Sequence, residues 1–417
     1  MNRRILIGII SAIMLSLLAG CSQPLPEAAP QPQQQEAASA SPAETMQPET
    51  QPVSPEPSQT TAGPDLLLQQ MTLEEKVGQM FIIRPDALDL IQTPEQIYDP
   101  DAEGVTELSS EMADVLKKYH VGGIALFGKN ILTPQQLTGF VEELQNAGGI
   151  PLFMAVDEEG GTVARLANNS AFDVVRYSSA ADVGASGDAA AAESMGAAIG
   201  AYLHQYGFNL DFAPVADVNS NPDNTVIGDR AFSSDAGTAA KMAKAMAEGL
   251  KQQRIIPTFK HFPGHGDTAE DSHNGIAVSY KSKEEMESCE WLPYEGLGAE
   301  NCVMVGHIAA PEITGDLTPA SMSPEIVNDI LRQQLGFDGV VITDSLAMGA
   351  VTDSYTPGEA AVNAIEAGCD ILLCPYDLQQ AFEAVVDAVN SGTISEERID
   401  ESVYRILLLK QTYGLLQ

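Results

Sequence analysis

The sequence predicts an α/β fold, a closed (β/α)8 barrel of the TIM type that forms a single domain. Three observations predict it. Short apolar runs alternate with segments of helical periodicity from about residue 65 onward, eight such units follow one another, and polar residues come directly after several apolar runs. This alternation is typical of parallel sheets, and eight units are enough to close one. An open, doubly wound sheet shows the same alternation and remains the alternative on pattern alone.

Each expected strand is a short run rich in Val, Ile, Leu or Phe, as buried parallel strands are. The expected strands are 78–84, 123–127, 152–156, 210–215, 256–260, 302–307, 339–343 and 370–374. Apolar residues with a period near 3.6 indicate helices between them. The expected helices include 107–119, 133–146, 181–206, 236–252, 323–335 and 358–367.

Polar residues at the expected strand ends indicate where a functional site lies. The carboxyl ends of all strands in a parallel barrel meet on one face, and active sites of such barrels lie there. The residues concerned are Asp157, Asp217, Lys260, His261, His307 and Asp344. Each alone is also compatible with a loop cap or a turn, so the prediction of a site depends on their recurrence at several strands.

Composition and charge exclude some functions. The chain has 417 residues, of which 44% are hydrophobic, enough for a large core. Its formal net charge is −37, with 58 acidic residues against 21 Lys and Arg, and no basic stripe reverses this locally. Such a surface repels phosphate backbones, so nucleic-acid binding is not expected.

The N-terminus, MNRRILIGIISAIMLSLLAGCSQ, has the features of a secretory signal: basic residues, then an apolar run too short for a membrane span. The small residues before Cys21 resemble the lipobox of bacterial lipoproteins, in which the cysteine is lipidated and becomes the mature N-terminus. We expect a signal peptide over 1–21 and a lipid anchor at Cys21. The domain would then lie outside the cytoplasm, on the cell membrane. An uncleaved signal anchor is the alternative.

Residues 22–64 are rich in Pro, Gln, Ala, Ser, Thr and Glu and predict a disordered tether, which leaves 65–417 for the barrel. Four cysteines remain after Cys21: Cys289, Cys302, Cys369 and Cys374. No CxxC occurs among them, which favours free thiols over a zinc site. A disulfide in an exported protein stays open.

The stretch KHFPGHGDTAEDSH, 260–273, holds three of the six histidines. His261 and His265 have the spacing of helical zinc ligands, but Pro263 and the glycines beside it exclude a regular helix. The segment is therefore expected to be a loop. A zinc site formed by loop ligands such as Asp271 and His273 remains an alternative, although no second motif supports it.

Proton chemistry is the favoured reading of this loop. In Asp271-Ser272-His273 the carboxylate can orient the imidazole and favour its protonated form, although the same spacing also caps turns. A second carboxylate is expected at Asp344, which ends the apolar strand VVIT and is a candidate nucleophile. The alternative for Asp344 is an N-cap of the next helix.

A family resemblance rests on several motifs taken together. KHFPGHGDT followed by DSH, VDEEGG with Arg165, GDRAF and ITDSLAM resemble the glycoside hydrolase family 3 β-N-acetylglucosaminidases, in the same order and over 66–414. The loop that ends in Asp-Ser-His is the most discriminating piece, because the β-glucosidases of the family lack it.

The resemblance implies a retaining glycosidase that needs no metal or other cofactor. Asp344 would attack the anomeric carbon, and His273, oriented by Asp271, would act as general acid and then as general base. The residues that match the family's sugar contacts are Asp157, Arg165, Arg230, Lys260 and His261. The implied substrate is a GlcNAc-containing glycan or muropeptide from peptidoglycan, and a monomer is expected.

Three rival functions stay open. A β-glucosidase or β-xylosidase of the same fold would share Asp344 but not the dependence on His273. A chitooligosaccharide hydrolase would use identical residues. A non-catalytic sugar-binding lipoprotein would fit the anchor and the tether but would give no reason for Asp344. Because members of the family that act inside the cell have no lipobox, the export signal here favours peptidoglycan turnover outside the membrane.

Overall fold

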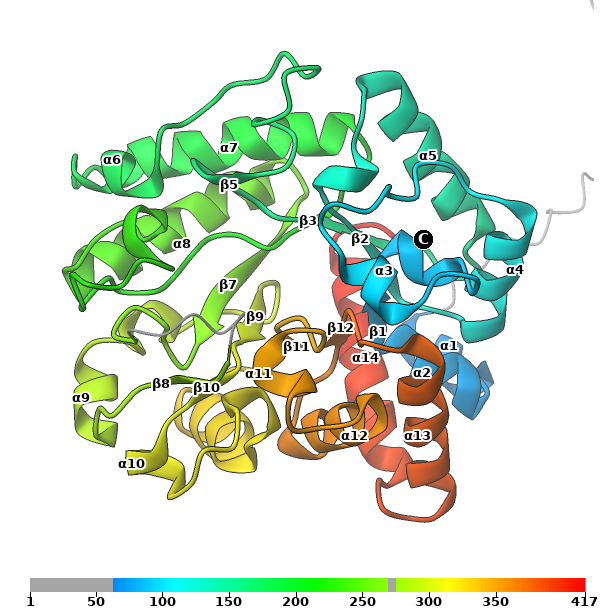
Figure 1. Cartoon of the computed structure of the whole chain (residues 1–417). Coiled ribbons are helices and arrows are strands. Elements are labelled where there is room, and N and C mark those ends of the chain that lie inside the picture. The colour runs from blue at the N-terminus through cyan, green and yellow to red at the C-terminus, as the bar shows by residue number, and fades with distance from the viewer. Residues whose placement is uncertain (1–62, 269–274, 417) are drawn as a thin grey trace, which may run out of the picture. The chain divides into compact units, whose positions relative to one another are not determined.

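Eight parallel strands form one ring in the described residues, 63–268 and 275–416 of a computed structural model (Figure 1). They are β1 (Phe81–Ile83), β2 (Gly123–Leu126), β3 (Phe153–Val156), β6 (Leu210–Asp211), β7 (Ile256–Phe262), β9 (Cys302–Val305), β11 (Val340–Thr343) and β12 (Leu372–Leu373). Neighbours in the ring follow chain order, and β1 pairs with both β2 and β12. A parallel bridge from Ile342 to Ile371 joins β11 to the segment before β12. The predicted barrel is confirmed, and the open sheet is wrong.

All eight expected strands occur, but some ends differ. The first begins at Phe81 and not at 78, because Leu73–Gln79 forms helix α2, which a Thr72–Glu75 capping box begins. The fifth continues to Phe262, beyond its expected end at 260. Every residue of β1, β2, β3, β6, β7, β9, β11 and β12 is buried, as strands covered on both faces require.

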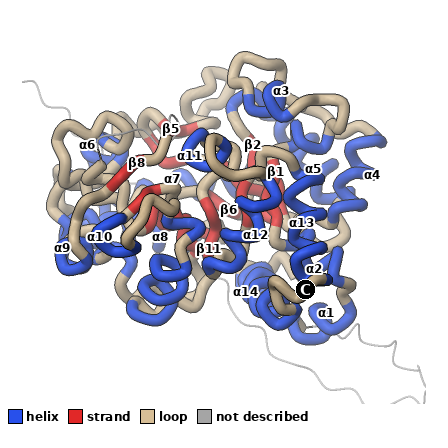
Figure 2. Tube along the Cα trace, turned by 60° about the horizontal axis from the view of Figure 1, so that its bottom comes forward, coloured by secondary structure: helices blue, strands red, loops and turns tan. Residues whose placement is uncertain are grey.

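Helices surround the ring (Figures 1 and 2). They are α1 (Pro64–Gln70), α2, α3 (Pro94–Tyr98), α4 (Ser110–Tyr119), α5 (Pro134–Ala147), α6 (Ala180–Gly184), α7 (Ala189–Gln205), α8 (Ala236–Gln252), α9 (Lys283–Ser288), α10 (Pro311–Thr314), α11 (Gly349–Thr352), α12 (Pro357–Ala367), α13 (Leu378–Asn390) and α14 (Glu396–Thr412). A π-helical segment, Glu325–Gln334, takes the place of the helix expected over 323–335. Two small two-stranded sheets extend the loops: an antiparallel pair, β4 (Glu158–Gly160) with β5 (Val163–Ala164), and a parallel pair, β8 (Ala277–Val278) with β10 (Ile308–Ala309).

The expected helix 181–206 is divided into α6 and α7. Gly187 has φ +61°, which an L side chain rarely adopts, and Asp188 begins the second helix by accepting the N–H of Ala190 at 3.0 Å. Two glycines then let α7 approach α8 closely. A Cβ on Gly196 would lie 2.0 Å from the Met246 carbonyl oxygen, and one on Gly249 would lie 2.1 Å from that of Glu193.

Several predictions fall on residues outside the described ranges. These are the signal peptide over 1–21, the lipidated Cys21, most of the 22–64 tether, and the pair Asp271 and His273. Helix α1 begins at Pro64, with which the predicted tether ends. Across 63–268 and 275–416, none of the helices combines the length and apolar character that crossing a bilayer requires. The four later cysteines are free thiols; three are buried, and Cys289 is half-buried.

Candidate active site

A cavity of about 410 Å³ opens at the carboxyl ends of the strands. Six of the eight predicted catalytic and sugar-binding residues line it: Asp157, Arg165, Arg230, Lys260, His261 and Asp344. The other two, Asp271 and His273, lie outside the described residues. Four of the six polar strand ends, Asp157, Lys260, His261 and Asp344, therefore converge on one face, as the barrel prediction required.

Two consecutive residues of β7, Lys260 and His261, both line this cavity. Side chains alternate between the two faces of a regular strand, so one of them would be expected to point away. The pairing with β9 shifts register between Lys260 and Phe262, and such a bulge re-aims side chains. The irregularity explains how KH can present two polar groups to the same space.

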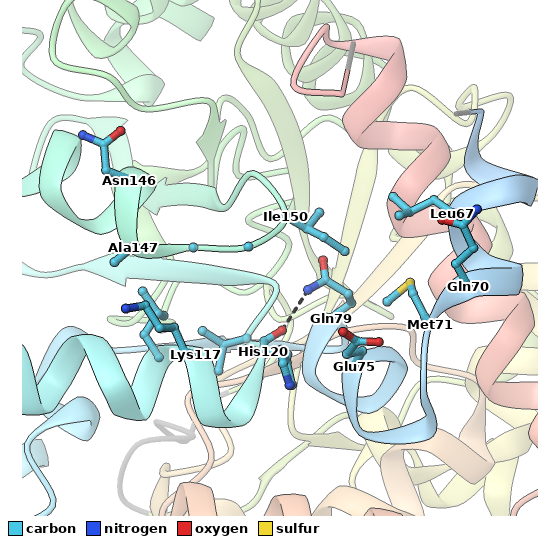
Figure 3. A pocket seen from close by; sticks show the side chains of 14 residues that line it. Leu67, Gln70, Met71, Glu75, Gln79, Lys117, His120, Asn146, Ala147 and Ile150 are labelled. Atoms are coloured by element: carbon cyan, nitrogen blue, oxygen red, sulfur yellow. Dashed lines mark hydrogen bonds between the residues drawn. The ribbon is translucent and has the colours of Figure 1, made fainter. Parts of the chain in front are cut away.

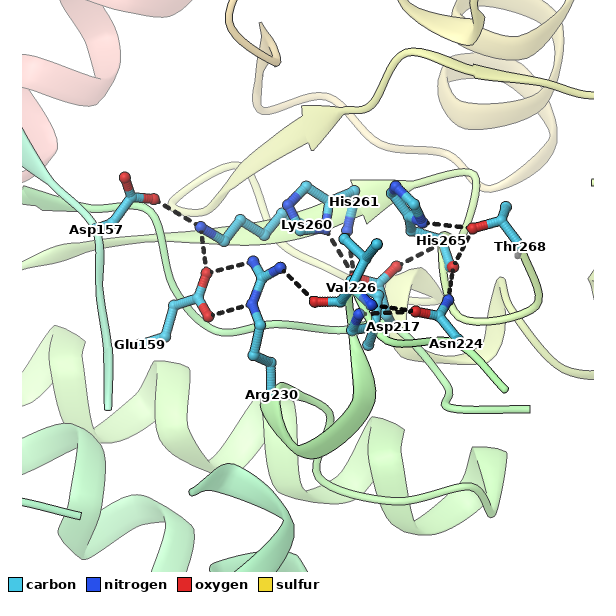
Figure 4. Close-up of polar contacts among 11 residues, drawn as sticks. Asp157, Glu159, Asp217, Asn224, Val226, Arg230, Lys260, His261, His265 and Thr268 are labelled. Carbon is cyan, nitrogen blue, oxygen red and sulfur yellow. Dashed lines mark hydrogen bonds and ion pairs between the residues drawn. The ribbon is translucent and has the colours of Figure 1, made fainter. Parts of the chain in front are cut away.

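Lys260 is the centre of an ion-pair network (Figure 4). Its Nζ lies 2.8 Å from Oδ1 of Asp157 and 2.7 Å from Oε1 of Glu159. Arg230 donates two hydrogen bonds to Glu159, from Nε to Oε2 at 2.8 Å and from Nη2 to Oε1 at 2.7 Å. Arg165 donates from Nη2 to Oδ2 of Asp157 at 3.2 Å. The alternation of charges holds each group in one orientation.

Glu159 is a residue of this network that the sequence analysis did not assign to the site. The signal was present in VDEEGG, where three acids follow a buried strand. Burial alone would raise the pKa of the Glu159 carboxyl, but Lys260 and Arg230 hold it below its ordinary value. For Asp157, Lys260 and Arg165 likewise outweigh burial and hold its pKa well below the usual range. Both acids are therefore ionised at neutral pH.

Glu158, between these two acids, faces away from the cavity and is fully buried. Its carboxylate accepts the N–H groups of Leu166 and Ala167 at 2.9 and 2.8 Å and the hydroxyl of Tyr202 at 2.8 Å. These bonds hold the chain that follows Arg165. Glu158 therefore has a structural role, since its carboxylate is hydrogen-bonded within the protein.

Asp344 follows β11 and reaches the cavity with few partners of its own. Its backbone N–H donates to the Val305 carbonyl at 2.8 Å, and Oδ1 accepts the N–H of Ser345 at 2.7 Å. No Lys or Arg of the described ranges forms an ion pair with it. Burial would raise the pKa of this carboxyl, yet the nearby His261 and His307 and the Ser345 N–H bring it below its ordinary value. The next helix, α11, has Met348 as its N-cap, so the capping alternative for Asp344 is wrong.

Two other polar strand ends, Asp217 and His307, are buried and do not line the cavity. The Asp217 carboxylate accepts hydrogen bonds from the ring Nδ1 of His261 at 2.7 Å and from the backbone N–H of His265 at 2.7 Å. His307 lies near Ser321 Oγ at 2.8 Å and the Ser345 carbonyl at 2.9 Å. These residues orient His261 and the segment after Asp344.

His261 and His265 do not form a metal site with other described side chains. Nδ1 of His265 faces the Thr268 hydroxyl at 2.7 Å, whereas His261 faces Asp217. In the described parts of the chain, no three His, Cys, Asp or Glu side chains are arranged to hold a metal ion.

A larger cavity, about 650 Å³, lies at the amino ends of the first three strands, and Figure 3 shows the side chains that line it. Residues that precede β1, β2 and β3 line it, among them Gln79, His120 and Ile150. Its acid, Glu75, is committed to the N-cap of α2, and the Gln79 amide donates to the His120 carbonyl at 2.8 Å. Because no group there resembles a catalytic pair, the smaller cavity is the better active-site candidate despite its size.

Comparison with known proteins identifies the family of the chain. Residues 72–409 match the model of the glycosyl hydrolase family 3 N-terminal domain. Beta-hexosaminidase LpqI of Mycobacterium tuberculosis is 36% identical over 324 residues, which cover 74% of this chain and 80% of the relative. Beta-hexosaminidase A of Pseudoalteromonas piscicida is 31% identical over 337 residues, 73% of this chain and 56% of the relative, so the chain spans little more than half of that protein.

A solved structure supports the same conclusion. The family 3 β-N-acetylglucosaminidase from a Paenibacillus strain superposes with a TM-score of 0.75 at 36% identity, covering 83% of this chain and 63% of that one. Both the sequence match and the barrel with its charged cavity lead to one assignment. The chain belongs to glycosyl hydrolase family 3.

Proposed function

We propose that this chain is a retaining exo-β-N-acetylglucosaminidase that removes non-reducing terminal GlcNAc from peptidoglycan fragments. Asp344 is the nucleophile, and His273, oriented by Asp271, is the general acid and base. One observation supports this most directly: an ionised Asp344 without a cationic partner among the described residues faces a cavity lined by a rigid cluster of charged groups. The names of the relatives, beta-hexosaminidase and β-N-acetylglucosaminidase, support the sugar specificity.

The first chemical step is a displacement at the anomeric carbon. An oxygen of Asp344 forms a bond to that carbon while the bond to the leaving oxygen breaks, and His273 gives its proton to the leaving oxygen. In the second step His273 takes a proton from water, the water oxygen bonds to the anomeric carbon, and Asp344 leaves. Two inversions give net retention.

The ion-pair network binds the terminal sugar. Asp157, Arg165, Arg230, Lys260 and His261 offer acceptors and donors to hydroxyl and acetamido groups in fixed directions. Glu159 contributes by holding Lys260 and Arg230 in place. Because these groups are already paired, they lose little conformational entropy when the sugar binds.

Location supports the choice of peptidoglycan as the source of substrate. We propose that Cys21 is lipidated and holds the barrel on the outer side of the cell membrane, where GlcNAc occurs in the wall polymer. Cys21→Ser is expected to leave glycosidase activity unchanged and to move the protein from the membrane fraction to the soluble fraction. An unaltered fractionation pattern would contradict the anchor.

The experiment that tests the function measures anomeric products. The full chain, purified in mild detergent, is expected to hydrolyse aryl β-N-acetylglucosaminide and to release β-GlcNAc first, as followed by NMR. Turnover is expected to continue in EDTA. Release of the α-anomer would exclude the retaining mechanism, and hydrolysis of aryl β-glucoside alone would select the glucosidase alternative. Loss of activity in EDTA and its recovery on addition of zinc would favour the alternative in which the 260–273 loop forms a zinc site.

A further inference from the structure

Two stretches of chain flank residues 269–274, which lie outside the described ranges. The first stretch follows β7 and contains His265, which lines the catalytic cavity, and Asp267. The second contains β8 and Ser279. His273, the proposed general acid and base, is six positions after Asp267 and six before Ser279. Contacts that fix the two stretches therefore limit where His273 can lie.

The first stretch is bonded to the loop that follows β6. The side-chain amide of Asn224 donates to the His265 carbonyl at 2.7 Å, and that of Asn221 donates to the Asp267 carbonyl at 3.3 Å. A Cβ on Gly266 would lie 1.8 Å from a carbonyl oxygen of the same loop, so the two backbones are in contact. These contacts fix the backbone at Asp267.

The second stretch is bonded to the segment after β9. β8 pairs in parallel with β10, and the Ser279 N–H donates to the Ala309 carbonyl at 2.9 Å. Lys281 then donates to the buried Glu290 carboxylate at 2.5 Å and to the Ser220 hydroxyl oxygen at 3.1 Å. Because Ser220 belongs to the loop after β6, both stretches are attached to that one loop.

A side-chain hydrogen bond also joins the two stretches directly. The Ser279 hydroxyl donates to Oδ2 of Asp267 at 2.5 Å, across 12 positions of the sequence. This bond closes the segment 268–278 at its base. Without it the two stretches would stay attached to their own neighbours, but the distance between them could vary, and the enclosed residues would gain conformational freedom.

The other oxygen of Asp267 indicates a role besides stability. Its Oδ1 is buried without a hydrogen-bond partner among the described residues, and so is Oε2 of Glu290. Burial, with the charge of Glu290 nearby, raises the pKa of the Asp267 carboxyl in spite of the Ser279 bond. A buried acid with an unused oxygen costs free energy, and such a cost is common at functional sites.

We propose that Asp267 is a positioning residue for the general acid: through its bond to Ser279 it fixes both ends of the segment that contains His273, and so the approach of the imidazole to the leaving oxygen. This inference rests on the proposed function, in which His273 is the acid and Asp344 the nucleophile. Asp267 does not line the cavity. Its loss should therefore weaken proton transfer and leave nucleophilic attack intact.

The test measures kcat/KM for a series of aryl β-N-acetylglucosaminides whose phenols differ in basicity, with the full chain in mild detergent. Asp267→Ala and Ser279→Ala are each expected to lower kcat/KM about tenfold for the most basic phenol, the value of one hydrogen bond, and less than about twofold for dinitrophenol. A plot of log kcat/KM against the pKa of the phenol should become steeper. The ratio between substrates within one preparation does not depend on the folded fraction.

Further variants isolate the bond. Asp267→Asn keeps an oxygen for the Ser279 hydroxyl and should stay within about threefold of wild type on every phenol. The double variant Asp267→Ala/Ser279→Ala should lose no more than either single variant, because both act through one bond. Asp235→Ala is the matched control: it removes a bond from the Thr238 hydroxyl, at 2.7 Å, to an acid that does not line the cavity. Its plot should keep the wild-type slope.

Equal losses on all phenols after Asp267→Ala would make Asp267 a structural residue and overturn the inference. An Asp267→Asn variant as impaired as Asp267→Ala, or additive losses in the double variant, would also overturn it, because the effect would not come from the bond.

His273→Ala in the same series separates this inference from the proposed function. If His273→Ala does not steepen the plot, or if the wild-type chain hydrolyses no member of the series, the proposed function itself is overturned. If His273→Ala steepens the plot and Asp267→Ala does not, only the positioning role of Asp267 is overturned.

Discussion

Two buried clusters of carboxylates and guanidinium groups lie at different places in the barrel, and they differ in how completely they are paired. One surrounds Asp370, where β11 meets the segment that leads into β12 and the ring closes. The other is the cavity that contains Asp157, Glu159 and Asp344. Both combine acids with arginines, but only the second leaves groups unpaired.

Both carboxylate oxygens of Asp370 have hydrogen-bond partners. Oδ1 accepts from Ser402 at 2.6 Å and from Arg405 at 3.1 Å, and Oδ2 accepts the Val341 N–H at 2.9 Å and pairs with Arg332. Burial would raise the pKa of this carboxyl, but the arginines keep it below its ordinary value. Because both oxygens of Asp370 are occupied by groups of the protein, this cluster leaves no acceptor for a ligand.

In the cavity, by contrast, Asp344 accepts one backbone N–H, and Arg84 lacks an acceptor among the described residues. Most buried polar groups of a folded chain are paired, and a site that a substrate completes is one reason for an exception. Incomplete pairing, more than the presence of charge, therefore distinguishes the cavity from the Asp370 cluster.

Removal of Asp344 should have the largest effect on activity. Asp344→Ala is expected to lower kcat at least about 10³-fold on every substrate, because the covalent route is lost whatever the leaving group. Thermal stability should stay unchanged or rise, since the carboxylate has no cationic partner to lose. Kinetics and thermal unfolding check both parts, with the exposed Asp353→Ala as control. Activity within tenfold of wild type would show that the nucleophile lies elsewhere.

Removal of His273 should have an effect that depends on the leaving group. His273→Ala is expected to cost about 10²- to 10⁴-fold on chitobiose, because general acid catalysis is lost. A dinitrophenyl glycoside needs no proton and should form the glycosyl-enzyme almost normally. A burst followed by slow turnover is then expected in stopped-flow traces, and Asp271→Ala should show a milder version. Equal losses on both substrates without a burst would remove His273 from the mechanism.

Removal of Asp370 should lower the stability of the fold and leave catalysis almost unchanged. Asp370→Ala leaves three arginines around a buried site and is expected to lower the free energy of unfolding by about 3 to 5 kcal/mol. The kcat of the folded fraction should change less than about twofold. Urea unfolding with the exposed Asp338→Ala as control measures this. A selective loss of kcat with normal stability would contradict the division between the two clusters.

Lys410 is a third case: a buried cation that has hydrogen bonds but forms no ion pair with a carboxylate of the described residues. Its Nζ donates to Gln79 Oε1 at 2.8 Å and to the Gly122 carbonyl at 3.0 Å. Burial lowers the pKa of Lys410 to about 7. Between that pH and about 10, the unfolded chain holds a proton that the folded chain has lost, so stability should rise with pH.

The expected effect of Lys410 on the free energy of unfolding is smaller than that of Asp370. It is confined to this pH window, where the free energy should rise by about 1.4 kcal/mol per pH unit at most. Lys410→Met should remove it, so that the difference between wild type and variant changes from pH 7 to pH 9 in urea titrations. Lys283→Met, at an exposed position, should retain the wild-type slope. Parallel slopes for wild type and Lys410→Met would mean that Lys410 titrates normally.

Much of the site was predictable because it follows strands. Asp157, Lys260, His261 and Asp344 each come at the end of an apolar run, and the barrel places such ends together. Glu159 and Arg84 were not assigned, although Arg84 ends the first expected strand. Local sequence gave no reason to prefer Glu159 over Glu158, since both follow the same strand and only their partners across the barrel distinguish them.

The alternation of strands and helices, the polar ends of the strands and the order of the family motifs can be predicted from sequence, because they depend on residues close together in the chain. Which charges are paired depends on the folded structure. Lys260 bonds Asp157 from 103 positions away, and Asp370 bonds an arginine 38 positions before it. Pairing across such separations depends on the closure and register of the whole ring, which no local pattern records. For that reason the lack of a Lys or Arg partner at Asp344 among the described residues could be recognised only in the folded chain.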